Sequence, residues 1–213
     1  MQQHQAQSMD LSKIYLITDR KATRNGRFLV DVVDEATAFG VKLVQLREKD
    51  LEEKDLISLA LNLKNICHKN SAKLLINSNL KLCKTLLLDG VHLPCDKSVK
   101  TARDFLGKNA LIGYSAHSTK EAITAQKEGA DFITLSPIYE TASKLKYGKP
   151  IGLSTLKDTS LVVKIPIFAL GGINKNRINE VIKSGATGVA AISAIISSES
   201  PKEAVKEFLN LLK

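Results

Sequence analysis

Aromatic residues are scarce in this chain of 213 residues, and their scarcity argues against one class of partner. Tryptophan is absent, and only four tyrosines and six phenylalanines are present. Proteins that bind single-stranded nucleic acid stack the bases on aromatic side chains beside a concentrated basic stripe. The lysines here are scattered, so we expect no nucleic-acid partner. The net charge of +9 is better suited to attracting a small anion.

Cysteines and long apolar runs are also few. The three cysteines, Cys67, Cys83 and Cys95, cannot all pair with one another, and none has the spacing of a zinc-ligand pair. We therefore expect neither a disulfide framework nor a zinc site, and the natural setting is the reducing cytoplasm. No apolar run approaches the roughly 20 residues of a membrane span, so no membrane partner is expected.

The start of the chain differs in composition from the rest. It is polar and rich in glutamine, and it lacks the apolar stretch of a secretory signal. We predict a disordered tail over residues 1–11. Residues 12–213 contain no shift of composition and no linker rich in proline or serine, which predicts one domain. The sequence does not fix the oligomeric state, so a homo-oligomer stays open.

Short runs rich in isoleucine, valine and leucine recur along this domain. They are almost continuously apolar, which is typical of parallel strands buried on both faces. The predicted strands are Ile14–Thr18, Leu43–Arg47, Leu74–Asn77, Val91–Pro94, Leu111–Ser115, Phe132–Pro137, Ile165–Leu170 and Val189–Ser193. The amphipathic stretches predicted as helices include Leu51–His68, Ser118–Lys127, Asn174–Lys183 and Pro201–Leu212.

The junctions between these elements repeat as well. Gly40, Gly129 and Gly185 each stand between a predicted helix and a strand, where a left-handed residue ends a helix. Ser118 and Glu121 have the spacing of a capping box at a helix start. Eight strands that alternate with helices predict an α/β fold, the TIM (β/α)8 barrel, as a single domain. A doubly wound open sheet is the alternative.

Functional residues of a TIM barrel lie at the carboxyl ends of its strands. Gly171 and Gly172 follow the seventh predicted strand, and Ile192 and Ser193 end the eighth. These two loops are the usual phosphate site of such barrels, because glycines allow a close approach and free N–H groups point at phosphate oxygens. A tight turn that needs glycine for a positive φ is the alternative for Gly171 and Gly172.

Cationic and amide side chains end the second and third predicted strands. By alternation, Gln45, Arg47 and Lys49 fall on one side of the chain, and the two cations suit an anion. An ordinary basic loop paired with Glu48 is the alternative. Asn77 is able to bond a heterocycle or a phosphate, or to form an Asx turn.

Candidate acid–base and loop residues follow the fifth and sixth predicted strands. His117 has polar neighbours, among them Ser115, and suits proton transfer near neutral pH. His92 lies inside the fourth strand, which favours a packed core residue. The long polar loop after the sixth strand is placed to close over an anionic ligand, with a flexible solvated loop as the alternative. The loop contains the cations Lys144, Lys146 and Lys149.

In order and spacing, these segments resemble the thiamine phosphate synthase/TenI family. The matching segments span nearly the whole domain and are Tyr15–Asp19, Gln45–Lys49, Leu75–Asn77, Asp89–Leu93, Gly113–His117, Ser136–Tyr139, Leu170–Ile173 and Ala191–Ile195. The resemblance implies a TIM barrel that acts on a hydroxyethyl-thiazole phosphate in thiamin biosynthesis. Synthases join this thiazole to an aminopyrimidine methyl pyrophosphate and release pyrophosphate with Mg2+. TenI proteins are tautomerases that aromatise a carboxythiazole phosphate by proton transfer without a metal.

The resemblance also implies residue roles. In the synthase pattern, Gln45 and Ser115 face the pyrimidine. The pyrophosphate would be held by Arg47, Lys49, Asn77 and Lys144. The thiazole phosphate would be held by Thr141, Ser143, Gly172, Ile192 and Ser193. In the TenI pattern, the histidine that matches His117 is the acid–base group, and Ser115 or Tyr139 would orient the substrate.

Two positions depart from the synthase pattern, and both concern the metal. Ser78 and Lys97 stand where synthases carry the two aspartates that bind Mg2+. Because Mg2+ prefers carboxylate oxygens, the replacements predict no protein metal site, with Mg2+ as a cofactor only if synthase activity is retained.

The replacements favour the metal-free tautomerase, an isomerase. Leu93-Pro94 and Tyr139-Glu140-Thr141 also match the TenI branch. Lys49, which TenI proteins often lose, favours the synthase, a transferase, and this activity stays as the alternative. A non-catalytic protein that binds thiamin precursors is the third hypothesis.

Overall fold

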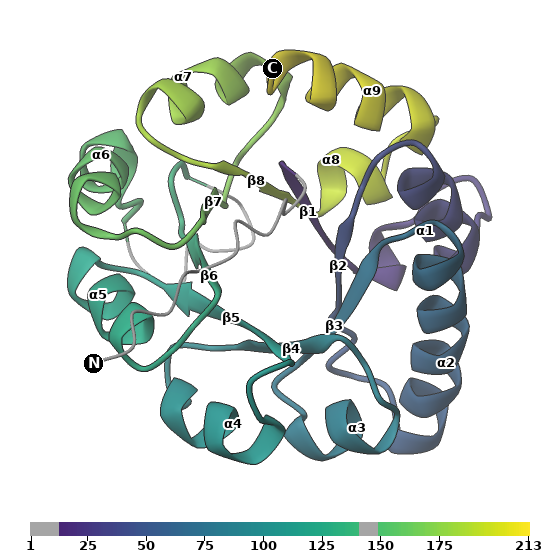
Figure 1. Cartoon of the computed structure of the whole chain (residues 1–213). Coiled ribbons are helices and arrows are strands. Elements are labelled where there is room, and N and C mark those ends of the chain that lie inside the picture. Colours follow the sequence, from purple (N-terminus) through teal and green to yellow (C-terminus); the bar gives the residue numbers. More distant parts are fainter. Residues whose placement is uncertain (1–12, 141–148) are drawn as a thin grey trace.

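Eight parallel strands close into a barrel in the order of the chain, β1 to β8 (Figure 1). The computed structural model describes residues 13–140 and 149–213, so the predicted tail over residues 1–11 lies outside the described residues. The strands are Ile14–Ile17 (β1), Leu43–Leu46 (β2), Lys73–Asn77 (β3), Gly90–Leu93 (β4), Leu111–Ala116 (β5), Phe132–Leu135 (β6), Ile167–Ala169 (β7) and Gly188–Ala191 (β8). The closed barrel confirms the predicted TIM fold and excludes the open sheet.

Helices surround the barrel as an outer ring, and the short helix Ser193–Ile196 (α8) is drawn inside this ring, near β1 and β8 (Figure 1). They are Leu29–Ala38 (α1), Glu53–Lys69 (α2), Leu80–Thr85 (α3), Val99–Leu106 (α4), Thr119–Lys127 (α5), Gly152–Val162 (α6), Ile178–Lys183 (α7), Ser193–Ile196 (α8) and Pro201–Leu211 (α9), with 3-10 turns at Arg20–Ala22 (η1) and Lys175–Arg177 (η3). Gly40, Gly129 and Gly185 have φ angles of 120°, 96° and 95°, which confirms the predicted left-handed helix ends.

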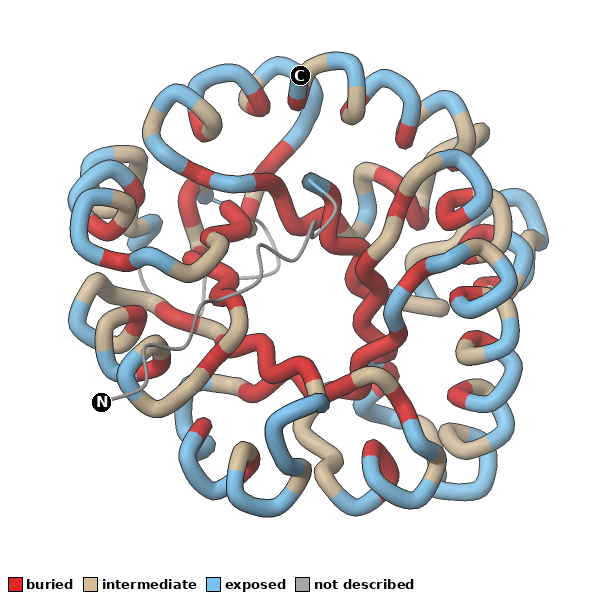
Figure 2. Tube along the Cα trace, in the orientation of Figure 1, coloured by how far each residue is buried: buried red, intermediate tan, exposed pale blue. Residues whose placement is uncertain are grey.

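Two apolar cores lie on the two sides of the sheet. The larger core fills the space between the strands and the helices. The smaller core fills the inside of the barrel and includes Tyr15, Leu43, Leu75, Phe132 and Phe168. Figure 2 accordingly shows the strands as nearly continuously buried, and the helices as buried mainly on their inner sides. The inside of the barrel is therefore filled with side chains and is not a pore.

The inside of the barrel is packed with aromatic rings. Tyr15 and Phe132 meet edge to face with their centroids 5.1 Å apart, and Phe132 meets Phe168 in the same way at 5.5 Å. Edge-to-face pairs of this kind stabilise a core beyond the area that they bury. These packed rings fill the inside of the barrel beneath the carboxyl ends of the strands.

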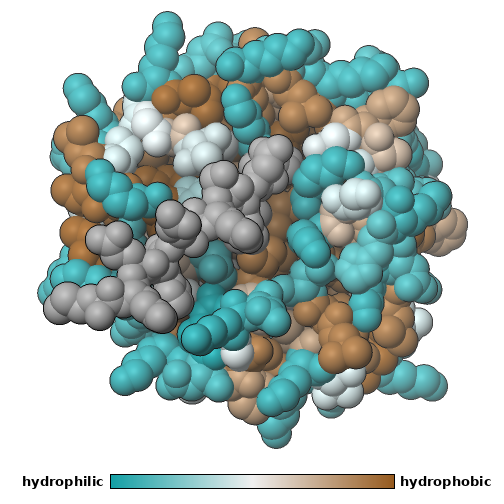
Figure 3. Space-filling model, in the orientation of Figure 1, coloured by the Kyte–Doolittle hydropathy of each residue, from teal (hydrophilic) through white to brown (hydrophobic). Residues whose placement is uncertain are grey.

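The outer surface mixes hydrophilic and apolar side chains, and the hydrophilic ones are spread around the face that Figure 3 shows. Within residues 13–140 and 149–213, none of the helices is long and apolar enough to cross a membrane.

Candidate functional site

Alternate residues of each strand point into the barrel. Leu43, Leu75, Leu111, Phe168 and Ala190 fill the interior, so residues two, four or six further along the same strands share its side. By this rule, the carboxyl end of the barrel is lined by Gln45, Arg47, Asn77, Ser115, His117, Gly172 and Ile192. The structure thus brings together residues that the sequence predicts from five different strands.

His92 provides a polar contact beneath this end of the barrel. Its ring is buried, and Nε2 lies 2.9 Å from the hydroxyl of Ser115. Among the described residues, Nδ1 has no hydrogen-bond partner. A buried lone pair is less costly to leave unpaired than a buried N–H, so hydrogen-bond accounting assigns the hydrogen to Nε2. Nε2 then donates to Ser115, and the Ser115 O–H is left to donate to a ligand.

The charge state of His92 agrees with this role. Burial, together with the nearby positive charge of Arg47, lowers the pKa of His92 to about 3. The ring is therefore neutral near pH 7. The interpretation of His92 as a packed core residue is confirmed for its burial, but it missed the bond to Ser115, because the two residues lie 23 positions apart.

His117 is held at two points. Its backbone N–H donates to the carboxylate of Glu121 at 2.7 Å, and its ring Nδ1 lies 2.6 Å from the carbonyl oxygen of Ser136. Because a carbonyl only accepts, Nδ1 must carry a hydrogen, and in the neutral ring Nε2 is then left with a lone pair. His117 is therefore oriented as a proton acceptor at Nε2.

The predicted capping box before α5 forms only in part. The Ser118 hydroxyl accepts from the backbone N–H of Glu121 at 3.2 Å, as predicted. The Glu121 carboxylate binds the N–H of His117 instead of that of Ser118, which corrects the second half of the motif. The difference matters because it ties the candidate acid–base residue directly to the first turn of α5.

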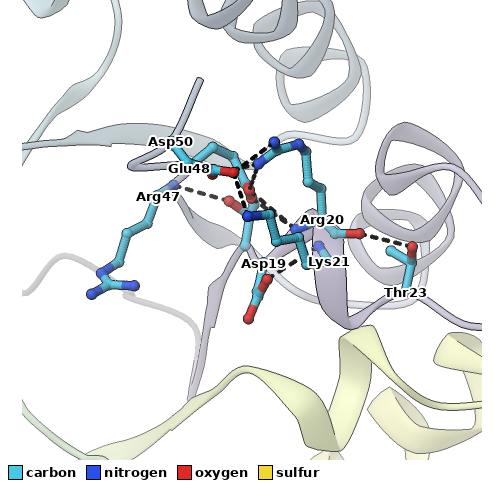
Figure 4. Close-up of polar contacts among 8 residues, drawn as sticks. Asp19, Arg20, Lys21, Thr23, Arg47, Glu48 and Asp50 are labelled. Atoms are coloured by element: carbon cyan, nitrogen blue, oxygen red, sulfur yellow. Dashed lines mark hydrogen bonds and ion pairs between the residues drawn. The ribbon is translucent and has the colours of Figure 1, made fainter. Parts of the chain in front are cut away.

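A charged cluster flanks Arg47 (Figure 4). Glu48 is buried, with 6% of its surface exposed, and accepts from the backbone N–H of Arg20 at 3.1 Å and from its guanidinium at 3.2 Å. Glu48 therefore pairs with Arg20 rather than with Arg47 or Lys49, which corrects the partner expected for an ordinary basic loop. Arg47 and Lys49 are exposed, and within the described part of the chain they form no ion pair. Their positive charge is available to a ligand.

Asn77 lies at the end of β3 and donates to the hydroxyl of Ser78 at 3.2 Å. The neighbouring Asn79, and not Asn77, caps α3 by accepting from the N–H of Leu82 at 3.0 Å. The sequence left an Asx turn open for Asn77, but the side chain that caps the neighbouring helix is that of Asn79.

The residues at the family's metal position do not fit a magnesium ion held by two carboxylates. Ser78 offers only a hydroxyl, and the Lys97 ammonium lies 3.9 Å from the carboxylate of Asp96. Within the described ranges, no group of three or more histidine, cysteine or acidic side chains is placed to hold a metal. An ammonium beside the single carboxylate opposes a cation.

The loops after β7 and β8 have features of a tight turn that needs glycine and also features of a phosphate site. Gly171 and Gly172 have φ angles of 99° and 67°, and a Cβ on Gly171 would lie 2.9 Å from that of Pro137. Glycine is thus required there for the backbone alone. At the same time, the N–H groups of Gly172, Ser193 and Ala194 meet no acceptor among the described residues. Such N–H groups are suited to bind phosphate oxygens.

Tyr139 is directed away from the two catalytic candidates. Its hydroxyl donates to Glu180 of α7 at 2.5 Å, and the guanidinium carbon of Arg177 lies 4.2 Å from its ring centre. Arg177 also donates to the carbonyl of Gly172 at 2.7 Å, so it joins the loops after β6 and β7. The structure does not bring the Tyr139 hydroxyl to Ser115 or His117. Thr141, Ser143 and Lys144 lie outside the described residues.

These features define the class of protein. Unpaired cations and backbone donors meet at the carboxyl end of a TIM barrel, which is the arrangement of barrel enzymes that bind small phosphorylated molecules.

Comparisons with known proteins narrow this class to a family. The family described as thiamine monophosphate synthase matches residues 14–195, and this chain belongs to it. A Clostridium novyi protein named thiamine-phosphate synthase is 38% identical over 95% of this chain and all of its own length. A Geobacter sulfurreducens protein provisionally named in the same way is 44% identical over 93% of each chain. The solved thiamine phosphate pyrophosphorylase of Pyrococcus furiosus superposes with a TM-score of 0.84 at 30% identity, covering 94% of this chain and 95% of its own.

Proposed function

We propose that this enzyme is a thiamine phosphate synthase, which joins a thiazole phosphate to an aminopyrimidine methyl pyrophosphate and releases pyrophosphate. The observation that carries the proposal is the presence of two separate groups of anion donors. Arg47 and Lys49 form a cationic group, and the N–H groups of Gly172 and Ser193 form a neutral one. Two phosphorylated substrates need two such groups, whereas a tautomerase binds one. The names of the relatives also support the synthase over the tautomerase favoured from the sequence.

Each group has a distinct task in this reaction. The carbon–oxygen bond to pyrophosphate breaks with its electron pair on the leaving oxygen, and the thiazole nitrogen supplies the pair for the new carbon–nitrogen bond. Arg47 and Lys49, with Asn77 beside them, stabilise the charge that develops on the pyrophosphate. Ser115 donates its O–H to the pyrimidine beside Gln45, whose own amide is anchored on Tyr15 at 2.9 Å.

A thiazole tautomerase is the second candidate, and Ser78 and Lys97 favour it because that reaction needs no metal. In that case Gly172 and Ser193 would anchor the one phosphate, and Nε2 of His117 would accept the ring proton. Its orientation by Ser136 and Glu121 supports this role.

A paired assay of the purified protein tests the proposal. One reaction contains the thiazole phosphate and the pyrimidine pyrophosphate with Mg2+, and the other contains only the non-aromatic carboxythiazole phosphate. We expect thiamin phosphate in the first reaction. Aromatisation in the second reaction alone would replace the synthase by the tautomerase, and His117→Ala should then abolish turnover with phosphate binding intact. Binding without turnover in either reaction would indicate the non-catalytic protein instead.

A further inference from the structure

We propose that Arg20 is a positioning residue that keeps Arg47 and Lys49 free for an anionic ligand by engaging the two carboxylates that stand next to them. The inference rests on the proposed function in one respect, namely that the anion is the pyrophosphate group of a substrate. Arg20 lies in η1 after β1, whereas the cations follow β2, so the contact joins two loops of the barrel.

The order of charges after β2 places a carboxylate beside each cation, and these carboxylates compete with a ligand for Arg47 and Lys49. Arg47, Glu48, Lys49 and Asp50 alternate in sign along four consecutive positions. Each cation therefore has an acidic neighbour on the chain. An arginine that already pairs with a carboxylate has no free fork for a phosphate, because both acceptors use the same N–H groups.

The Arg20 side chain engages both acids at once. One guanidinium nitrogen lies 3.2 Å from Glu48 and 2.6 Å from Asp50, and the other lies 2.9 Å from the second oxygen of Asp50. Lys21 adds a further contact of 2.6 Å to Asp50. These bonds hold the pKa of Asp50 well below its usual range, so this acid stays ionised beside the cations. Figure 4 shows the Arg47 side chain pointing away from this cluster.

Because the Glu48 side chain is buried, its carboxylate requires a cationic partner. Only 2% of its side chain is exposed, compared with 31% for Arg20. A buried carboxylate without a partner is strongly unfavourable, so it recruits the nearest available cation. With Arg20 in place, that cation comes from another loop. Without it, Arg47 and Lys49 are the cations nearest along the chain.

The backbone keeps the two sets of charges on opposite sides. The N–H of Arg47 donates to the hydroxyl of Thr18 at 2.9 Å, and the N–H of Arg20 donates to Glu48. These two bonds fix β1 and β2 relative to each other just beyond their ends. The alternation then directs Glu48 toward Arg20 and Arg47 toward the open end of the barrel.

Calorimetric titration with inorganic pyrophosphate tests this role. We expect Arg20→Gln to weaken binding by about tenfold, since one ligand cation becomes paired internally. Arg24→Gln is the matched control, because Arg24 is an exposed residue of the same loop whose side chain forms no hydrogen bond or ion pair with the described residues. This control should bind pyrophosphate like the unaltered protein.

A rescue experiment separates positioning from a merely structural role. In the triple variant Arg20→Gln, Glu48→Gln, Asp50→Asn, the competing carboxylates are gone, and we expect the affinity to return to within about twofold. Circular dichroism would verify that each variant is folded, and Arg20→Lys offers a milder substitution that keeps the charge. Equal binding by the Arg20 and Arg24 variants, or a triple variant as weak as Arg20→Gln, would overturn the inference.

The experiments distinguish a failure of the proposed function from a failure of the inference about Arg20. Pyrophosphate binding that depends on Arg20, in a protein without synthase turnover, would remove the proposed function and support this inference. Absence of pyrophosphate binding by the unaltered protein would overturn both.

Discussion

Two histidines of the site are fixed in opposite tautomers by their partners. His92 carries its hydrogen on Nε2 and donates to Ser115, whereas His117 carries it on Nδ1 and donates to Ser136. The first arrangement leaves the Ser115 O–H able to donate to a ligand, and in the neutral ring the second leaves Nε2 of His117 able to accept. The two rings thereby give the carboxyl end of the barrel one group of each kind.

We predict that the buried His92 makes the folded protein less stable at acidic pH. Its pKa of about 3 in the folded protein lies below the usual 6.5, so the unfolded chain binds a proton between these values that the folded protein does not bind. Stability is therefore fully present above pH 6.5 and is lost as the pH falls toward 3. Between pH 6.5 and 5.0 this amounts to about 1.5 kcal/mol.

The prediction is checked by urea unfolding at both pH values, in the unaltered protein and in His92→Gln. The glutamine retains a donor for Ser115 but does not titrate. Other groups, such as Asp89, titrate in both proteins and cancel in the difference. The pH-dependent loss should be smaller in the variant by the amount above, and an identical loss in both proteins would show that His92 is protonated in the folded state.

Restoring carboxylates at the family's metal position should restore dependence on Mg2+. Ser78 has a φ of 61°, a conformation that aspartate tolerates better than most residues. We expect the double variant Ser78→Asp, Lys97→Asp to show a larger Mg2+ stimulation of synthase turnover than the unaltered protein. Ser78→Asn, Lys97→Gln is the control, since it removes the same groups without adding charge. The same Mg2+ response in both variants would contradict this interpretation.

At the scale of elements, the start of α5 couples stability to the site. The Ser118 hydroxyl accepts from Glu121 at 3.2 Å, and Glu121 in turn holds His117. Ser98 caps α4 through the N–H of Thr101 at the same distance of 3.2 Å, and its helix holds no candidate site residue. The two serines form a matched pair that differs in what the helix start supports.

We predict that Ser118→Ala and Ser98→Ala each lower the free energy of unfolding by about 1 kcal/mol. In the tautomerase reaction, where His117 is the proton acceptor, only Ser118→Ala should also lower kcat, several-fold, because the contact that orients His117 becomes looser. Chemical denaturation and steady-state kinetics on the same preparations measure both effects. If the two variants lost activity equally, the cap of α5 would have no special link to the site.

The elements were predictable to different degrees for physical reasons. Strands buried on both faces are continuously apolar, so all eight could be located from the sequence. The ends were less clear, because β7 covers only Ile167–Ala169 of its apolar run, and the stretch from Asn174 begins as a 3-10 turn before α7. Arg20 and Arg177 were missed because their partners come from other loops. The one available signal was an acidic residue, Glu48, directly after a buried strand.

At the scale of the whole molecule, the positive charge acts locally. The chain carries +9, but its lysines are spread around the outside, and hydrophilic side chains show the same spread in Figure 3. Salt screens exposed charges beyond about 8 Å at physiological ionic strength, which is much shorter than the length of a barrel. The distant lysines therefore contribute little to the site, whereas the proposed function places Arg47 and Lys49 in direct contact with the substrate.

Charge reversals at the opposite end of the barrel test this argument. Lys127 and Lys183 end α5 and α7, and Lys108 precedes β5, so all three lie toward the amino ends of the strands. Reversing all three to glutamate would lower the net charge from +9 to +3. At about 0.15 M salt, we expect kcat/KM for the pyrophosphate substrate to stay within about twofold, because these charges are screened.

The local cations should respond quite differently. Lys49→Gln removes a single charge, yet we expect it to lower kcat/KM by about tenfold or more, since the lost contact is direct. Steady-state kinetics at low and physiological ionic strength would measure both variants side by side. A larger loss in the triple reversal than in Lys49→Gln would mean that the field of the whole protein, and not the loop after β2, gathers the substrate.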